Sequence, residues 1–519
     1  MFLPLPHRLI AMFAVVLAVP GATVNAAEGN STALTIYSKA TPGAIPPGIY
    51  RPGMRSQYSL INLRQMIPGY AIVKQERRVE LDRGRSTIRF TDVASQIDPT
   101  TVAFTSLTDP DGTSVLEQDY QFDLVSAAKL MERYLGRQIT VEQSTGDKIS
   151  TFTGKLLSTS GGVVLQGADG SVQVVNGYSN VRFGELPGGL ITKPTLVWEV
   201  FTNQPGAHRT RVTYETKGIA WWADYNVVFA EGENANQGVL GVGAWVSIIN
   251  QSGATYQDAK LKLIAGDVHR APQPEPARMY GEKRMRGVQA MSKEALGFEE
   301  KAFFEYHLYT LGRPTTLPDN STKQIELFPT ARNVPCEKVL VYYGLPAGYR
   351  RVRRNRTTDR NLGIASNKKI DIYLRLKNEK AVGMGMPLPS GRIRVSQLDP
   401  ADGSLEFIGE DTIDHTPKDE EVLIKLGSAF DVVGERKQMD FQIDKRRQWM
   451  EETIEIKLRN HKEEPVKVLV KENLYRWVNW KITSKSHKFE KIDARTVHFP
   501  ITVDKDGEVT ITYTVEYTW

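Results

Sequence analysis

The chain holds 519 residues and carries a formal net charge of +6, from 66 Lys and Arg against 60 Asp and Glu. Hydrophobic residues make up 40% and charged residues 24%. This composition excludes disorder over most of the chain and supplies enough apolar side chains for several domain cores. So small a charge surplus, spread over this length, indicates no particular polyanionic partner.

The N-terminal segment is typical of a secretory signal peptide. A weakly basic start precedes the apolar run Leu9–Val19, and Val24–Ala26 has the small-x-small pattern that predicts cleavage after Ala26. A membrane-spanning helix needs about 20 apolar residues, and neither this run nor any later segment is that long. We therefore expect residues 1–26 to be removed and the mature protein to be exported, periplasmic or extracellular, without a transmembrane anchor.

Alternation of apolar and polar residues predicts β-strands through most of the mature chain. A strand over Ala33–Ser38 precedes an irregular, proline-containing stretch near 39–68, and further strands follow at Ala71–Val73, Arg78–Leu81 and Ser86–Phe90. We expect residues 27–122 to form an N-terminal β domain with an irregular insertion near 39–68.

A single helix is predicted after this domain. Ser126 is a suitable N-cap and Gly136 a suitable terminator, and the residues between them carry an apolar stripe. Five short strands follow, a pattern that resembles the small Sm-like barrel; they are Gln138–Glu142, Thr151–Leu157, Val163–Gln166, Ser171–Val175 and Val181–Phe183. We expect residues 123–190 to form a helix plus a five-stranded barrel that acts as a structural spacer.

Longer strands are predicted from residue 191 onward. A β-sandwich is expected over 191–302, ending in a mobile loop near 271–301, where prolines and charges replace β-branched residues. A C-terminal β-sandwich region is expected over 303–519. The predicted fold class is mainly β: multi-domain β-sandwiches with an inserted small Sm-like or SH3-like barrel preceded by one helix.

Several ordered blocks resemble the bacterial domain-of-unknown-function family 4139, whose members are exported and mostly β. The resemblance runs from about Ala33 to Trp519 and implies no activity, cofactor or catalytic residue. Two places depart from the family pattern, the stretch Lys39–Pro68 and the arginine-rich loop Arg350–Arg356. The blocks that carry the resemblance are Phe304–Leu311, Leu317–Gln324, Ser366–Lys369, Pro387–Gly391, Phe407–Arg436 and Tyr513–Trp519.

No local pattern of an enzyme or a metal site is present. The histidines form no H-x-H or H-x-x-x-H pair, and there is no G-x-S-x-G elbow, P-loop or G-x-G-x-x-G before a helix. The only cysteine, Cys336, is expected to be a small buried residue. We therefore predict no catalytic, cofactor-binding or metal-binding residues, and no cofactor, although carboxylates from different strands can still converge in a fold.

Two clusters are candidates for ligand binding. In a loop, the guanidinium groups of the arginine cluster can bind phosphate or carboxylate groups, although a solvated basic loop explains them as well. In a strand, Tyr475 and Trp477 would share one face and can stack on a sugar ring, although a sandwich core also contains such aromatics. The arginine cluster comprises Arg350, Arg351, Arg353, Arg354 and Arg356.

These patterns favour an exported, non-catalytic binding or structural protein of the cell envelope, with an unknown ligand. The alternative is a hydrolase that acts on an envelope polysaccharide or peptide polymer, for which two buried acids in a deep pocket would be the sign. The candidate partners are an envelope polysaccharide or another envelope protein; nucleic acid is not expected, and the oligomeric state does not follow from the sequence.

Overall fold

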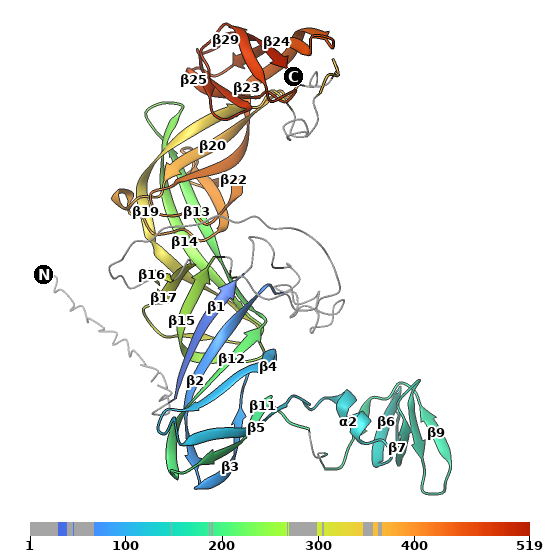
Figure 1. Ribbon diagram of the computed structural model, residues 1–519. Helices are drawn as coiled ribbons and strands as arrows, with labels where there is room; N and C mark the ends of the chain where they lie inside the picture. The colour runs from blue at the N-terminus through green and yellow to red at the C-terminus, as the bar shows by residue number, and fades with distance from the viewer. Residues whose placement is uncertain are drawn as a thin grey trace, which may run out of the picture.

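The computed structural model describes residues 30–38, 45, 67–146, 148–185, 187, 190–266, 268, 298–303, 306–345, 357–361 and 366–519. This part of the chain is mainly β, with several sheets and one α-helix, which confirms the predicted fold class at that level. Figure 1 shows the larger sheets following one another along an elongated body, with a small unit projecting from its side.

The first sheet has eight strands, in the order β16-β17-β15-β1-β2-β12-β4, with β18 paired to β15. Strand β1 lies inside this sheet, parallel to β15 on one side and antiparallel to β2 on the other. The strands are β1 (Ser31–Ser38), β2 (Gly69–Leu81), β4 (Ile97–Ser106), β12 (Gly206–Lys217), β15 (Tyr256–Ala265), β16 (Phe298–Phe303), β17 (Tyr306–Leu311) and β18 (Thr315–Leu317).

The second sheet has thirteen strands and carries the C-terminus. Its longest strands, β19 and β23, have 22 and 24 residues and connect two hydrophobic cores. The strands are β13 (Ile219–Glu231), β14 (Gln237–Asn250), β19 (Ser321–Tyr342), β20 (Lys369–Lys377), β21 (Gly391–Leu398), β22 (Leu405–Ile413), β23 (Glu421–Asp444), β24 (Trp449–Asn460), β25 (Val466–Asn473), β26 (Trp480–Lys485), β27 (Glu490–Lys491), β28 (Thr496–Val503) and β29 (Glu508–Thr518), and a 3₁₀ turn, η4 (Lys380–Val382), follows β20.

A three-stranded sheet and a five-stranded sheet complete the structure. In the first, β11 (Thr195–Thr202) lies between β3 (Gly84–Thr91) and β5 (Thr113–Gln121). The second has the order β10-β6-β7-β8-β9 and follows helix α2. Its elements are α2 (Ala127–Arg133), β6 (Gln138–Thr145), β7 (Lys148–Ser158), β8 (Val163–Gln166), β9 (Val172–Val175) and β10 (Asn180–Arg182).

The predicted helix and its five strands are confirmed as elements. The Ser126 hydroxyl accepts a hydrogen bond from the Lys129 N–H at 3.2 Å, and Gly136 has a φ of 79° just after the helix. Side chains from α2 and the sheet form a small core of their own. In the described residues, no pairing joins the outer strands β9 and β10, so the barrel stays a prediction.

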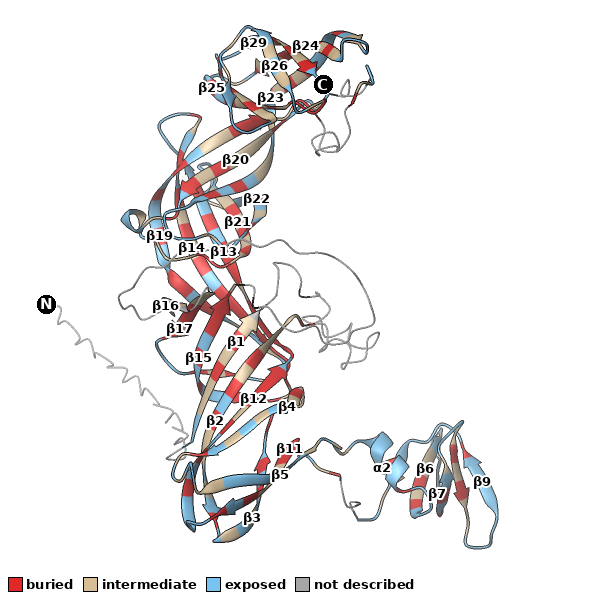
Figure 2. Cartoon of the chain, viewed as in Figure 1, coloured by how far each residue is buried: buried red, intermediate tan, exposed pale blue. Residues whose placement is uncertain are grey.

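The sheets join strands from both sides of residues 123–190 and from both sides of residue 302. Strand β11 pairs with β3 and β5, and β12 pairs with β2 and β4, so strands on both sides of 123–190 share sheets. Strand β17 pairs with β15 across the boundary expected at 302/303. Figure 2 shows buried residues following the strands along the whole body. Residues 123–190 are thus an insertion into one continuous body.

Two local predictions are corrected. The loop expected near 271–301 ends earlier, because Phe298–Phe303 is strand β16, paired with β17; residues 271–297 lie outside the described part. Tyr475 and Trp477 do not lie in a strand, since residues 474–479 are bends and irregular backbone and β26 begins only at Trp480. The hydrogen bonds of Arg476, described below, hold this irregular backbone in place.

Candidate functional site

Strand β1 forms the floor of a trough on the outer face of the first sheet. Its alternation directs Leu34 and Ile36 into the core, where each is at most 1% exposed, and leaves Ser31 and Ala33 on the other face. The neighbouring strands carry long charged side chains on this outer face. Because the side chains above β1 are short and those beside it are long, a hollow opens along the strand.

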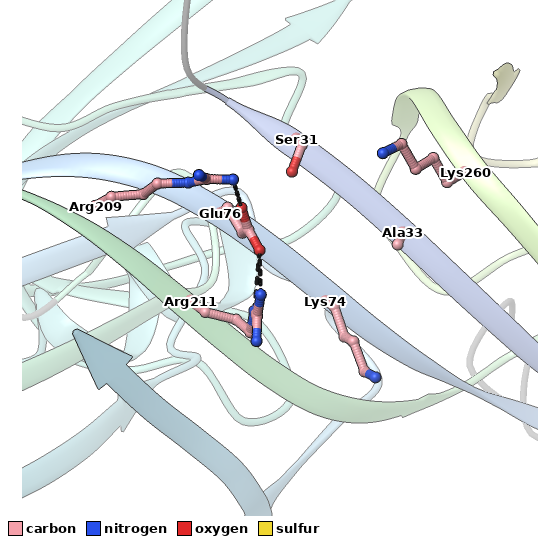
Figure 3. Close-up of a pocket in the computed structure, with 7 residues that line it drawn as sticks. All are labelled: Ser31, Ala33, Lys74, Glu76, Arg209, Arg211 and Lys260. Carbon is pink, nitrogen blue, oxygen red and sulfur yellow. Dashed lines mark hydrogen bonds and ion pairs between the residues drawn. The ribbon is translucent and has the colours of Figure 1, made fainter. Parts of the chain in front are cut away.

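The hollow has a volume of about 310 Å³ and a lining that is mostly charged. Figure 3 shows the charged side chains arranged on both sides of β1. The described lining contains four cations and one carboxylate, a formal surplus of +3 (4 − 1). We call this hollow the basic trough; its lining residues are Ser31, Ala33, Lys74, Glu76, Arg209, Arg211 and Lys260.

Glu76 holds the two arginines in the trough. Arg211 donates to Glu76 Oε1 from Nε at 3.0 Å and from Nη2 at 2.6 Å, and Arg209 donates to Glu76 Oε2. The Arg211 hydrogen bond, with the charge of both arginines, keeps the pKa of Glu76 below its ordinary value. Glu76 therefore stays ionised at neutral pH and fixes the arginines beside β1.

The two lysines of the basic trough differ from the arginines. Lys74 and Lys260 are exposed, and no carboxylate within the described residues forms an ion pair with either of them. They lie on opposite sides of Ala33, which is the register partner of both. These ammonium groups are thus available to an anion lying over β1, and the chemistry of the lining is that of an anion-binding surface.

A second cluster of charges is buried in the C-terminal core. Arg476 Nε donates to Glu452 at 2.7 Å, and Arg436 Nε donates to Glu472 at 2.9 Å, with all four side chains at most 2% exposed. Tyr517 and Tyr513 on β29 donate to the same two glutamates, at 3.1 Å and 2.5 Å. Burial raises the pKa of both tyrosines well above the ordinary value, so they remain donors.

The buried cluster bears on the hydrolase alternative. It supplies two buried acids, and a pocket of about 110 Å³ is lined by Glu472, whose Oε1 has no hydrogen-bond partner. Each acid, however, already accepts hydrogen bonds from an arginine and a tyrosine of the core, so both carboxylates are engaged in holding the core together. The Cα of Gly344 also lies against Glu472 Oε1, since a Cβ there would be 2.8 Å from it.

The residues predicted to bind a ligand do not form this site. Arg350, Arg351, Arg353, Arg354 and Arg356 lie outside the described residues. Tyr475 is 6% exposed and its hydroxyl lies 3.5 Å from Glu452, so it is part of the buried cluster. Trp477 is half-buried against the same core. The two rings therefore follow the alternative given for them, aromatic side chains packed in the core, and sugar stacking by them stays a prediction.

Another pair of residue types used in catalysis, a serine beside a histidine, is buried in the core. His208 is 1% exposed and accepts from the Ser106 hydroxyl at Nδ1, 2.9 Å away, while Nε2 donates to the Gln204 carbonyl at 2.7 Å. This Ser–His pair has no solvent access. Within the part of the chain that the structure describes, no three His, Cys, Asp or Glu side chains are grouped to hold a metal ion.

The residues of the basic trough were missed by the sequence reasoning. The available signal was a pair of cations two residues apart on a strand, as in Arg209 and Arg211, which places both on one face. Nothing local indicates that this strand approaches Lys260 or Lys74.

Comparison of the chain with models of protein families, with curated proteins and with solved structures finds no match in any of the three. Within the described residues, no helix has the length and apolar character needed to cross a membrane.

Proposed function

We propose that this chain is an exported, non-catalytic binding protein of the cell envelope, and that its ligand carries anionic groups that lie in the basic trough. The observation that carries the proposal is the +3 surplus around the short side chains of β1, with Lys74 and Lys260 exposed on either side. Binding proteins commonly present such a surface on a rigid scaffold. The envelope location rests on the signal-like N-terminus, and N-terminal sequencing of the exported protein should begin at Ala27.

Two further assignments belong to this proposal. Membership of the bacterial domain-of-unknown-function family 4139 rests on the ordered sequence blocks. An Sm-like closure of the insertion is supported by the strand order β10-β6-β7-β8-β9, which places the last strand of the unit beside the first. In this role the insertion is a spacer.

Co-sedimentation with envelope fractions tests the function. The mature protein should sediment with envelope at low ionic strength and be released as salt is added, because exposed ion pairs are screened. Lys74→Gln combined with Lys260→Gln should weaken sedimentation. The matched control is Lys488→Gln with Lys505→Gln, two exposed lysines of the C-terminal region, which should leave it unchanged. Equal sedimentation of both double variants would place binding elsewhere, and no sedimentation at all would contradict the envelope proposal.

One observation favours a hydrolase as the second candidate function, namely the buried Glu452 and Glu472 beside a small pocket. Hydrolysis of purified envelope polymers should then be lost in Glu472→Gln. The arginine partners of both acids make this the weaker proposal.

A further inference from the structure

We infer that the ligand of the basic trough is a linear phosphodiester polymer, in which three-carbon units join successive phosphates, and that it lies along β1. This inference rests on the proposed function, since it names the ligand class of the same site. It comes from the register of the four strands around the trough.

The strand register places cations in successive rows across the sheet. We call each row a level; it consists of directly opposed residues on neighbouring strands, and successive levels on one face are two residues apart. At the level of Ala33 are Lys74 and Lys260, and at the level of Ser31 is Arg211, which lies opposite Glu76. One level further toward the N-terminal end, Arg78 lies opposite Arg209.

The series of levels that carry cations, here called the ladder, continues toward the C-terminal end of β1. Lys262 is the register partner of Thr35, one level beyond Ala33. Four successive levels thus carry at least one cation. Among the cations of these levels, the exposed ones that form no ion pair with a described residue are Lys74, Arg78, Lys260 and Lys262. Carboxylates share this face as well. Glu76 is bonded to both arginines, and Glu80 lies one level beyond Arg78. At the level of Thr35, Lys262 is accompanied by Glu215, which is 6% exposed, and by Asp98 and Glu299.

The distance between adjacent levels indicates the distance between the negative charges of the ligand. Adjacent levels are two residues apart, about 6.6–6.8 Å along a strand. Two residues contain six backbone bonds, and a phosphodiester chain with a three-carbon linker also has six backbone bonds from one phosphorus to the next (P–O, O–C, C–C, C–C, C–O and O–P). An extended chain of this kind therefore places one negative charge at each level of the ladder, over a length of about 20 Å between the first and last levels.

Single-stranded nucleic acid has the same backbone repeat, but the trough is unsuited to its bases. Proteins that bind single strands stack bases on aromatic side chains. None of the described residues that line the hollow is aromatic, and its floor consists of Ser31 and Ala33. The aromatic pair on this face, Tyr37 and Tyr70, lies one level beyond Lys262, and its two rings are stacked on each other. A polymer without bases matches this lining.

Binding of defined oligomers tests the inference. Oligo(glycerol phosphate) chains with one, two, four and six phosphates are titrated against the mature protein at fixed ionic strength. Affinity should rise with each phosphate up to four and then increase little, because four levels are available. Lys74→Gln and Lys260→Gln should each lower the affinity of the four-phosphate chain about two- to fivefold, whereas Lys488→Gln and Lys505→Gln should not change it.

Glu76→Gln provides a test in the opposite direction. The substitution retains the shape of the side chain and removes the charge that neutralises the arginines, so oligomer affinity should increase. A merely structural role for Glu76 would change stability and leave the affinity of the folded protein unaltered. Unchanged or reduced affinity would overturn the inference.

Two comparison ligands separate this inference from the function on which it rests. Polygalacturonate has ring-spaced carboxylates and a single-stranded oligonucleotide has bases, and both should bind more weakly than the four-phosphate chain at equal charge. If either binds as tightly, the phosphodiester assignment is overturned. If the protein sediments with envelope fractions but the oligomers do not compete for it, the phosphodiester assignment fails and the envelope-binding proposal stands. If no anionic polymer binds and the protein does not sediment with envelope fractions, both the assignment and the proposed function fail.

Discussion

The guanidinium of Arg476 is held against the carboxylate of Glu452, with Nε to Oε2 at 2.7 Å and neither side chain more than 1% exposed. The same guanidinium lies 4.4 Å from the ring centre of Phe441 and donates to the carbonyl of Asp359 at 2.8 Å. One buried ion pair thus joins strand β24, the irregular segment 474–479 and the segment 357–361.

Arg476→Met should strongly destabilise the C-terminal region, because it leaves Glu452 as an uncompensated buried charge. Removing one partner of such a pair costs about 3–5 kcal/mol. The midpoint of urea unfolding measures the loss. The exposed pair Arg375–Glu337, with side chains 42% and 46% exposed, is the control; Arg375→Met should cost less than about 1 kcal/mol. Similar losses in the two variants would contradict this account.

Gly434→Ala should destabilise the same core. An added Cβ would lie 2.2 Å from the ring of Tyr342, which is fully buried, and overpacking of this kind costs about 1–3 kcal/mol. Gly427 lies in the same strand with nothing within 4 Å of the equivalent position. Gly427→Ala should therefore have little effect, and thermal unfolding of the two variants compares them directly. A harmless Gly434→Ala would show that the ring moves freely.

The ion pairs of Glu76 predict how stability depends on pH. Its pKa is lower in the folded protein than the ordinary 4.5, so above pH 4.5 the ionised form stabilises the fold. That contribution is lost as the pH falls through the lowered folded value, because the folded state must then take up the proton. The difference in unfolding free energy between the wild type and Glu76→Gln should be constant near neutrality and shrink in acid. A difference that grew in acid would contradict it.

Cys336 should be unreactive in the folded protein. The side chain is 7% exposed, and burial raises the pKa of its thiol from 9.0 to about 11. At a given pH this leaves about 100-fold less thiolate than an ordinary cysteine has. Alkylation by iodoacetamide at pH 8 should be slow in buffer and fast in denaturant. Rapid alkylation in buffer would show that this part of β19 opens.

The insertion should be removable. Val125 N–H donates to the Ile191 carbonyl at 2.9 Å, so the segments that lead into and out of the insertion lie side by side. The insertion also has a hydrophobic core of its own. Replacing residues 126–189 by a short Gly/Ser linker should leave the urea unfolding of the body unchanged. Tryptophan fluorescence measures this selectively, because no tryptophan lies in that segment. A large loss of stability would show that the insertion supports the body.

Local sequence patterns were sufficient to predict most of the strands and the helix α2. Alternation identified the strand cores of β1, β2 and β3, and Ser126 and Gly136 marked the two ends of α2. They failed at Tyr475 and Trp477, where an apolar, aromatic run resembles a strand but the backbone is set by the buried hydrogen bonds of Arg476. Such bonds depend on partners far along the chain.

The sequence by itself determined that the described part of this protein is mainly β, which faces of its strands are apolar, and where helix α2 begins and ends. These properties depend on residues within a few positions of each other. Only the tertiary structure decided that β1 lies between β2 and β15, and so brought Lys74 and Lys260 to either side of Ala33. Those lysines are 186 positions apart (260 − 74), and strand pairing over such a distance is fixed by packing of the whole sheet. The mild net charge of the chain gave no sign of the basic trough, because a small surplus becomes a binding surface only when the fold gathers it on one face.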